Sequence, residues 1–200
     1  SKGAKVNRTG QPIRKELRDA VSSRIEGEPL VLVLGGSQGS AFLNERVPES
    51  QVRGVRYLHA AGRSNMPSFQ SRPIPPDYEV VAYLETPQLI DAYRRATVVV
   101  ARSGGTLAEL AMFGLPSVLI PLPTAADDHQ HHNAEEFVAM GAATLVPQAE
   151  ATPQTLRAAV AEWLGDPARR SEAARSLASW DVPDATERIV ALVEKASTRK

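Results

Sequence analysis

The stretch Leu30-Val-Leu-Val-Leu34-Gly35-Gly36-Ser37-Gln38-Gly39-Ser40 decides the fold of this 200-residue chain. Five consecutive apolar residues predict a strand buried on both faces, and the small residues after them predict a tight turn into a helix. Glycines in such a turn let backbone N–H groups approach an anion, and the N-terminus of the following helix adds partial positive charge. The stretch therefore predicts either an anion-binding loop or merely a tight connection.

The same alternation of strand and helix continues along the chain. Apolar runs predict strands at residues 30–34, 55–59, 78–83, 97–101, 117–121 and 143–146. Amphipathic stretches predict helices at residues 40–47, 86–96, 106–113, 132–140, 155–164, 168–179 and 184–195. This order is typical of parallel strands joined by crossover helices. We therefore predict an α/β fold with a Rossmann-like, doubly wound parallel sheet of about six strands.

The first part of the chain differs from the rest. Residues 1–28 are polar and basic, with one short helical stretch at 15–24, and we predict that they form an interdomain connection. Residues 29–200 then form a single domain, in which residues 64–77, with four prolines, are predicted to be a surface loop. Because the chain begins with Ser1 and not with Met, we expect it to be part of a longer protein.

Composition limits the classes of partner. The chain is 42% hydrophobic and 23% charged, as globular domains are, and its formal net charge is zero. Since no summed positive field attracts polyanions, we expect no nucleic-acid partner, and any phosphate must be recognised locally. The chain has no cysteine, which is consistent with the cytoplasm. No apolar run approaches the roughly 20 residues that span a bilayer.

A second glycine turn, Arg102-Ser103-Gly104-Gly105, follows the predicted strand at 97–101 and precedes a helix. Parallel strands end at the same edge of a sheet, which is where ligands of α/β folds bind, so both turns can share a pyrophosphate. Glu109 lies three residues after Thr106. That spacing fits a capping box, and from spacing alone we favour the cap over a ligand contact for Glu109.

Three other functions can be tested against the first turn. It lacks the lysine of a P-loop, and it does not match the dinucleotide fingerprint, because no acidic residue follows the second strand. It does match G-x-S-x-G, the nucleophile elbow of α/β-hydrolases, with Ser37 as nucleophile and Asp and His residues following at 127–132. We keep a hydrolase as an alternative, although such an elbow normally follows several strands and this one follows the first.

A polar cluster at residues 127–133 contains two aspartates and three histidines. Its histidines lack the i, i+4 spacing of a helical zinc site, so we expect no metal there. Side chains that both donate and accept hydrogen bonds suit a ligand rich in hydroxyl groups better.

Several motifs, taken together and in order, resemble the carboxyl-terminal domain of the MurG-like UDP-N-acetylglucosamine transferases of glycosyltransferase family 28. They are residues 35–39 (GGSQG), 98–105 (VVVARSGG), 108–110 (AEL), 114–116 (GLP) and 126–130 (ADDHQ), with Asn133-Ala134 after them. Residues 9–14 (TGQPIR) and 182–189 (VPDATERI) extend the match over nearly the whole chain.

The resemblance implies that the chain is one half of a GT-B glycosyltransferase and binds the donor, UDP-N-acetylglucosamine. Carried over by position, the diphosphate contacts come from Arg14, the turn Gly36, Ser37, Gln38 and Gly39, and the turn Ser103, Gly104, Gly105 and Thr106. Backbone near Leu84 pairs with uracil, and Glu109 holds the ribose, which reverses the preference for a cap. His129 and Gln130 face the hydroxyl groups of the sugar.

The resemblance also implies an inverting reaction without metal or other cofactor, in which GlcNAc passes to a lipid-linked muramyl peptide during peptidoglycan synthesis. The catalytic base is unknown from this chain and is expected in an amino-terminal GT-B domain, supplied in cis or as a partner chain. We expect a cytoplasmic protein, peripheral at the inner face of the membrane through that domain. The alternative is a UDP-sugar-binding module that needs a partner chain to act.

Overall fold

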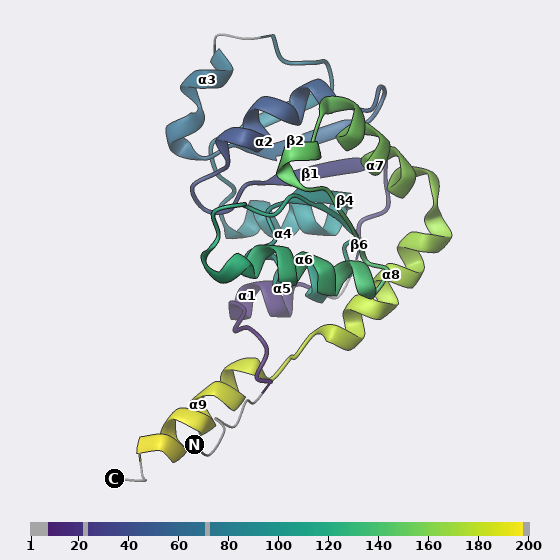
Figure 1. Ribbon diagram of the computed structural model, residues 1–200. Helices are drawn as coiled ribbons and strands as arrows, with labels where there is room; N and C mark the ends of the chain where they lie inside the picture. Colours follow the sequence, from purple (N-terminus) through teal and green to yellow (C-terminus); the bar gives the residue numbers. More distant parts are fainter. Residues whose placement is uncertain (1–7, 22–23, 71–72, 198–200) are drawn as a thin grey trace.

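The computed structural model describes residues 8–21, 24–70 and 73–197. Within these ranges the strands form one sheet in the order β3-β2-β1-β4-β5-β6 (Figure 1). Every neighbouring pair is parallel. The strands are β1 (Leu30–Leu34), β2 (Arg56–Ala60), β3 (Tyr78–Val81), β4 (Ala96–Ala101), β5 (Ser117–Leu119) and β6 (Ala143–Leu145). The predicted fold, a doubly wound parallel sheet of six strands, is confirmed.

Helices cover both faces of this sheet. Crossovers between parallel strands are right-handed, so the direction in which the chain moves along the sheet decides which face each helix covers. The chain moves one way from β1 to β3, which places α2 on one face, and the opposite way from β3 to β6, which places α4, α5 and α6 on the other. No helix within the described ranges is both long and apolar enough to cross a membrane. The helices are α1 (Lys15–Asp19), α2 (Ala41–Arg46), α3 (Pro67–Gln70), α4 (Thr86–Arg95), α5 (Thr106–Met112), α6 (His129–Ala139), α7 (Pro153–Gly165), α8 (Pro167–Trp180) and α9 (Ala185–Ser197).

The centre of the core lies around β1 and β4. Val31, Leu32 and Val33 are completely buried, as are Val98 and Val99 beside them. The strand order changes direction between these two strands, because β2 and β3 follow on one side of β1 while β5 and β6 follow on the other side of β4. Loops at the carboxyl ends of two such strands diverge and leave a crevice between them.

The starting segment is tied to the domain. Leu17 of α1 is fully buried, and the Ile25 N–H donates to the carbonyl of Arg94. The predicted helix at 15–24 ends earlier, at Asp19. That residues 1–28 connect to another domain stays a prediction, and residues 1–7 and 22–23 of it lie outside the described part of the chain.

Several boundaries differ from the sequence prediction. Strand β3 ends at Val81, where its last partner Ala60 ends β2, and β5 ends at Leu119 opposite the last residue of β6. The predicted loop at 64–77 contains the helix α3, because Phe69 is buried there against the His59 ring, 5.6 Å between centroids.

A further difference changes the site. Helix α6 begins at His129 and not at residue 132, so His129 and Gln130 belong to its first turn and not to a loop. The chain turns into this helix through Asp127 and Asp128, whose φ angles are 50° and 52°. Two consecutive residues in the left-handed region are uncommon outside glycine, and apolar periodicity does not reveal them.

The turn after β1 packs directly on the end of β2. A Cβ added to Gly39, at φ +75°, would lie 1.8 Å from the Ala61 carbonyl oxygen, and one added to Gly62 would lie 2.1 Å from the Gln38 carbonyl oxygen. The Asn65 side-chain amide donates to both of these carbonyls, at 2.9 and 3.1 Å. Glycine is therefore required by a close backbone approach as well as by the φ angle.

We expect Gly39→Ala to lower the free energy of unfolding by at least about 2 kcal/mol more than Gly54→Ala does. Gly54 also has a positive φ, +72°, but a Cβ there meets nothing within 4 Å, so it isolates the conformational strain. Urea denaturation of both variants measures the difference. Equal losses would contradict the close approach of the two backbones.

Candidate functional site

Two cavities meet at the carboxyl edge of the sheet. The first has a volume of about 170 Å³ and the second about 480 Å³. Gly36, after β1, and Thr106, at the start of α5, line both of them. The cavities are therefore adjacent between the ends of β1 and β4, at the point where the strand order reverses and α/β folds bind ligands.

The cavities collect most of the predicted site residues. The first is lined by Arg14, Gly36, Ser37, Leu84, Thr106 and Glu109, together with residues that the sequence analysis did not single out, among them Tyr83 and Tyr93. The second is lined by Gly36, Gly39, Gly104, Thr106 and Gln130, together with Ser40, Arg102 and Gln148 among others. These residues come from several separate loops and helices of the chain, so only the fold brings them together.

Glu109 is not a helix cap. Helix α5 starts after Gly105, and no side chain caps its N-terminus. Instead Glu109 Oε2 accepts a hydrogen bond from the Tyr93 hydroxyl at 2.6 Å, while Oε1 lies 3.9 Å from Arg14 Nη2. The capping-box interpretation favoured by spacing is therefore wrong, and the carboxylate is held at the wall of the first cavity.

Arg14 brings positive charge to the same wall. Its guanidinium is about half exposed and donates to the Thr86 hydroxyl at 2.8 Å, across 72 positions of sequence. Thr86 begins α4, so this hydrogen bond ties Arg14 to the start of that helix beside the cavity. A guanidinium in this position presents its remaining N–H groups to an anion.

Four predicted residues line neither cavity. Gln38 contributes its carbonyl to the contact with Asn65, and Gly105 precedes α5, where an added Cβ would lie 2.9 Å from Gln11 Nε2. Ser103 is buried and donates its hydroxyl to the Gln130 carbonyl at 2.7 Å. The positions of these three residues indicate that they stabilise the two glycine turns.

His129 is the fourth of these. Its Nδ1 lies 2.7 Å from the Ala126 carbonyl oxygen, and its side chain is exposed. Gln130, by contrast, lines the second cavity, and its Oε1 accepts from the Leu122 N–H at 3.0 Å. The orientation of Gln130 is therefore fixed, with its side-chain N–H groups left for a ligand.

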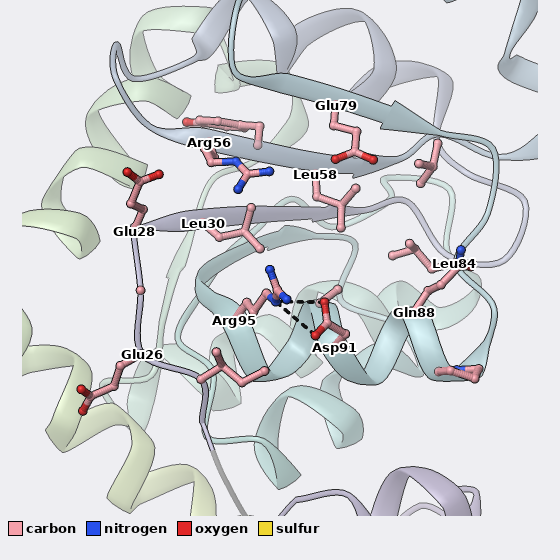
Figure 2. A pocket seen from close by; sticks show the side chains of 16 residues that line it. Glu26, Glu28, Leu30, Arg56, Leu58, Glu79, Leu84, Gln88, Asp91 and Arg95 are labelled. Atoms are coloured by element: carbon pink, nitrogen blue, oxygen red, sulfur yellow. Dashed lines mark hydrogen bonds and ion pairs between the residues drawn. The ribbon is translucent and has the colours of Figure 1, made fainter.

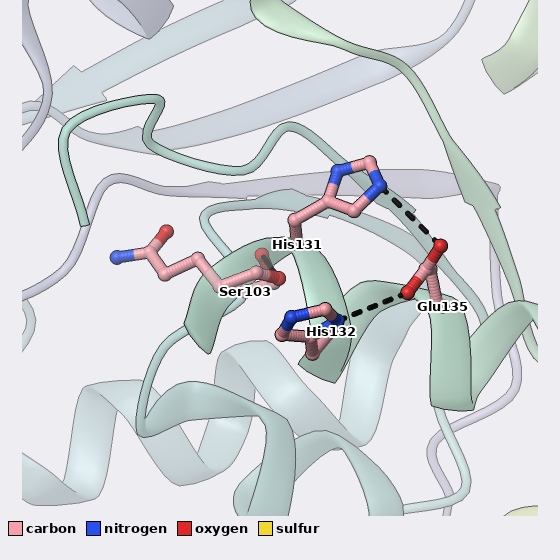
Figure 3. A network of polar contacts seen from close by, with 5 residues as sticks. Ser103, His131, His132 and Glu135 are labelled. Carbon is pink, nitrogen blue, oxygen red and sulfur yellow. Dashed lines mark hydrogen bonds and ion pairs between the residues drawn. The ribbon is translucent and has the colours of Figure 1, made fainter. Parts of the chain in front are cut away.

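The neighbouring histidines engage a carboxylate and not a metal site. Figure 3 shows Glu135 reaching both imidazoles, with 3.4 Å to His131 Nε2 and 3.2 Å to His132 Nδ1. All three side chains are substantially exposed. Among the described residues no group of three or more His, Cys, Asp or Glu side chains is arranged to hold a metal ion.

The hydrolase alternative finds no catalytic partner for its nucleophile. Ser37 is exposed at the rim of the first cavity. Within the described ranges no hydrogen bond joins its hydroxyl to a histidine, although a serine nucleophile needs a base in reach.

Sequence reasoning missed Arg102, which organises the second cavity. This side chain is 9% exposed, and its guanidinium donates to four oxygens. They are the carbonyls of Ile120 and Pro121 at 2.9 and 3.0 Å, Gln148 Oε1 at 2.7 Å and Ser40 Oγ at 3.3 Å. Burial lowers the pKa of this guanidinium. The sequence did contain a signal for Arg102, because a charged residue that directly follows a buried strand must be paired.

A larger cavity lies elsewhere. It measures about 620 Å³ and is bounded by β1, β2, β3 and α4 (Figure 2). Its walls carry Leu30, Leu58 and the ion pair of Asp91 with Arg95, 3.0 Å apart. Of the predicted site residues only Leu84 reaches it. Size alone therefore does not identify the candidate site.

Comparison with known proteins relates the chain to one enzyme family. The model of the glycosyltransferase family 28 C-terminal domain matches residues 30–189. A UDP-N-acetylglucosamine--N-acetylmuramyl-(pentapeptide) pyrophosphoryl-undecaprenol N-acetylglucosamine transferase from Halorhodospira halophila is 40% identical over 208 residues, which cover 98% of this chain and 58% of that protein. The chain thus spans little more than half the length of the curated relatives it matches.

Solved structures give the same relation. The crystal structure of Acinetobacter baumannii MurG superposes with a TM-score of 0.74 at 29% identity, over 90% of this chain and 53% of that one. The glycosyltransferase VinC, solved in complex with dTDP, superposes with a TM-score of 0.65 at 19% identity, over 94% of this chain and 45% of that one. VinC shares the fold only.

We expect Arg102→Lys to lower the free energy of unfolding by about 2–4 kcal/mol, because lysine cannot reproduce the planar set of donors and leaves buried oxygens unpaired. Arg53→Lys, at an exposed arginine outside both cavities, is the matched control and should change it by about 0.5 kcal/mol or less. Denaturant titration measures both. If the two variants were equally stable, the hydrogen bonds of Arg102 would contribute nothing.

Proposed function

Because this chain belongs to the family of glycosyltransferase family 28 C-terminal domains, we propose that it is the donor-binding half of a glycosyltransferase and holds UDP-N-acetylglucosamine by its diphosphate. The observation that carries the proposal is the junction of the two cavities at Gly36 and Thr106. A nucleotide sugar consists of two bulky ends joined by a diphosphate, and two cavities joined by a glycine-lined neck match that outline.

The two ends of the donor are assigned by chemistry. In the first cavity the Glu109 carboxylate is the acceptor that ribose hydroxyls require, and the backbone at Leu84 offers hydrogen bonds to uracil. In the second cavity Gln130 and the backbone of Gly104 face the sugar. His129 lies outside both cavities, so we propose that Gln130 makes the sugar contact without it.

The diphosphate lies at the neck. Backbone N–H groups of Gly36 and Ser37 and the start of α5 at Thr106 offer hydrogen bonds, and the Arg14 guanidinium adds a full positive charge. These groups stabilise the negative charge that develops on UDP as the leaving group. They supply what a divalent cation supplies in other transferases, so we propose that the reaction needs no metal.

The acceptor and the base belong to an amino-terminal half. The relatives, which are nearly twice as long as this chain, carry names that specify a pyrophosphoryl-undecaprenol acceptor. We propose an acceptor of this lipid-linked muramyl class for the whole protein, which would act at the inner face of the cell membrane in peptidoglycan synthesis. The proposal of a second half is supported by exposed apolar side chains on α9, at Val190, Leu192 and Val193, against which another domain can pack.

The donor assignment predicts weaker UDP binding in Glu109→Ala. Loss of a carboxylate that accepts from ribose should reduce affinity by about 2- to 150-fold, equivalent to about 0.5–3 kcal/mol. Calorimetric titration with UDP measures this, with Glu172→Ala, an exposed carboxylate on α8, as the matched control. Unchanged affinity in Glu109→Ala would remove Glu109 from the donor site.

The division of labour predicts that this chain alone transfers no GlcNAc to a lipid-linked muramyl acceptor. Catalysis needs a positioned acceptor and a base as well as leaving-group stabilisation, and each contributes several kcal/mol. Adding the separately produced amino-terminal half of the Halorhodospira halophila relative should restore product. Product from the lone chain, abolished by His129→Ala, would instead place the base in this half.

A further inference from the structure

A buried phenol stands behind the carboxylate of the first cavity. Tyr93, on α4, is 1% exposed, and its ring packs against Phe113 with 4.9 Å between centroids. Its hydroxyl donates to Glu109 Oε2 at 2.6 Å. This side-chain hydrogen bond joins α4 to α5.

This contact leaves the two oxygens of Glu109 in different environments. Oε2 is engaged by Tyr93, while Oε1 lies 3.9 Å from the nearest guanidinium nitrogen of Arg14, too far for a hydrogen bond. Oε1 therefore keeps its acceptor capacity. Burial, followed by the nearby Glu109 charge, raises the pKa of Tyr93 well above its ordinary value, so the hydroxyl stays protonated and donates throughout the neutral range.

The fold by itself does not decide between ribose and 2′-deoxyribose. VinC, which shares this fold at 19% identity, was solved with dTDP, a 2′-deoxynucleotide. Discrimination must therefore come from side chains at the sugar. The bound nucleoside removes water from a carboxylate beside it. If that carboxylate is held in place, a ligand without a 2′-hydroxyl leaves it unpaired and binds more weakly, whereas a mobile carboxylate can rotate toward water and avoid this loss of affinity.

We propose that Tyr93 is a positioning residue that holds Glu109 with one oxygen directed at the ribose hydroxyls, and that it thereby makes the donor pocket select ribonucleoside over 2′-deoxyribonucleoside diphosphates. This inference rests on the proposed donor function. Tyr93 itself donates no hydrogen bond to the nucleotide, because its single hydroxyl proton is already given to Glu109.

The test is Tyr93→Phe, which keeps the ring and removes only the hydroxyl. Calorimetry with UDP and with 2′-deoxyuridine 5′-diphosphate should show that the unaltered chain prefers UDP by about tenfold or more. In Tyr93→Phe, UDP affinity should fall about 3- to 10-fold while affinity for the deoxy ligand stays unchanged, so the preference nearly disappears. Tyr57→Phe is the matched control: Tyr57 is equally buried, its hydroxyl accepts from the Val52 N–H at 3.2 Å, and it does not line the first cavity.

A purely structural role gives a different result. It would weaken both ligands equally, or would lower the melting temperature without changing the preference, and either outcome overturns the proposal. Glu109→Ala separates the two levels of inference. If the unaltered chain does not bind UDP, the proposed donor function fails. If Glu109→Ala keeps the preference, Glu109 is not the ribose acceptor and the inference about Tyr93 fails, while the donor function stands. If Glu109→Ala loses the preference and Tyr93→Phe keeps it, only the role of Tyr93 fails.

Discussion

Hydrogen bonds from the Arg102 guanidinium hold together loops that follow four different strands. They join the turn after β1, through Ser40, to the end of β5, through the Ile120 and Pro121 carbonyls, and to Gln148 beyond β6. Arg102 itself directly follows β4, which ends at Ala101. Parallel strands bring these loops to one edge without fixing the distances between them. The Arg102 guanidinium is planar, stays charged and donates on several sides, so its hydrogen bonds fix the distances between these loops. The second cavity lies between the loops that it holds apart.

The sheet was predictable because its central strands carry an unambiguous pattern. Five apolar residues in β1 and the valines of β4 have no other favourable environment than a sheet covered on both faces. The start of α6 was not predictable, since it depends on left-handed φ angles at Asp127 and Asp128, which composition does not reveal. Likewise α3 exists because Phe69 finds the His59 ring, and that contact crosses between segments of the chain.

The site was partly predictable for a related reason. Glycine turns that follow buried strands can be recognised locally, so the positions of Gly36 and Gly104 at the second cavity could be predicted from the sequence. The environment of Glu109 could not, because Tyr93 lies 16 positions away and local spacing imitates a capping box. Family resemblance replaced the cap with a ribose contact for Glu109, which stays a prediction. It also placed His129 at the sugar, which is untested; in the structure the His129 Nδ1 atom lies against the Ala126 carbonyl oxygen.

Helix α9 has a practical consequence for anyone who studies this chain in isolation. Figure 1 shows it projecting away from the sheet, and Ile189, Leu192, Val193 and Ala196 follow one another at the helical spacing that forms a single apolar stripe. Two such stripes can pair in water and bury each other, as in a short coiled coil. Self-association of the isolated chain through α9 should therefore increase with protein concentration. The sedimentation coefficient should then fall as the protein is diluted.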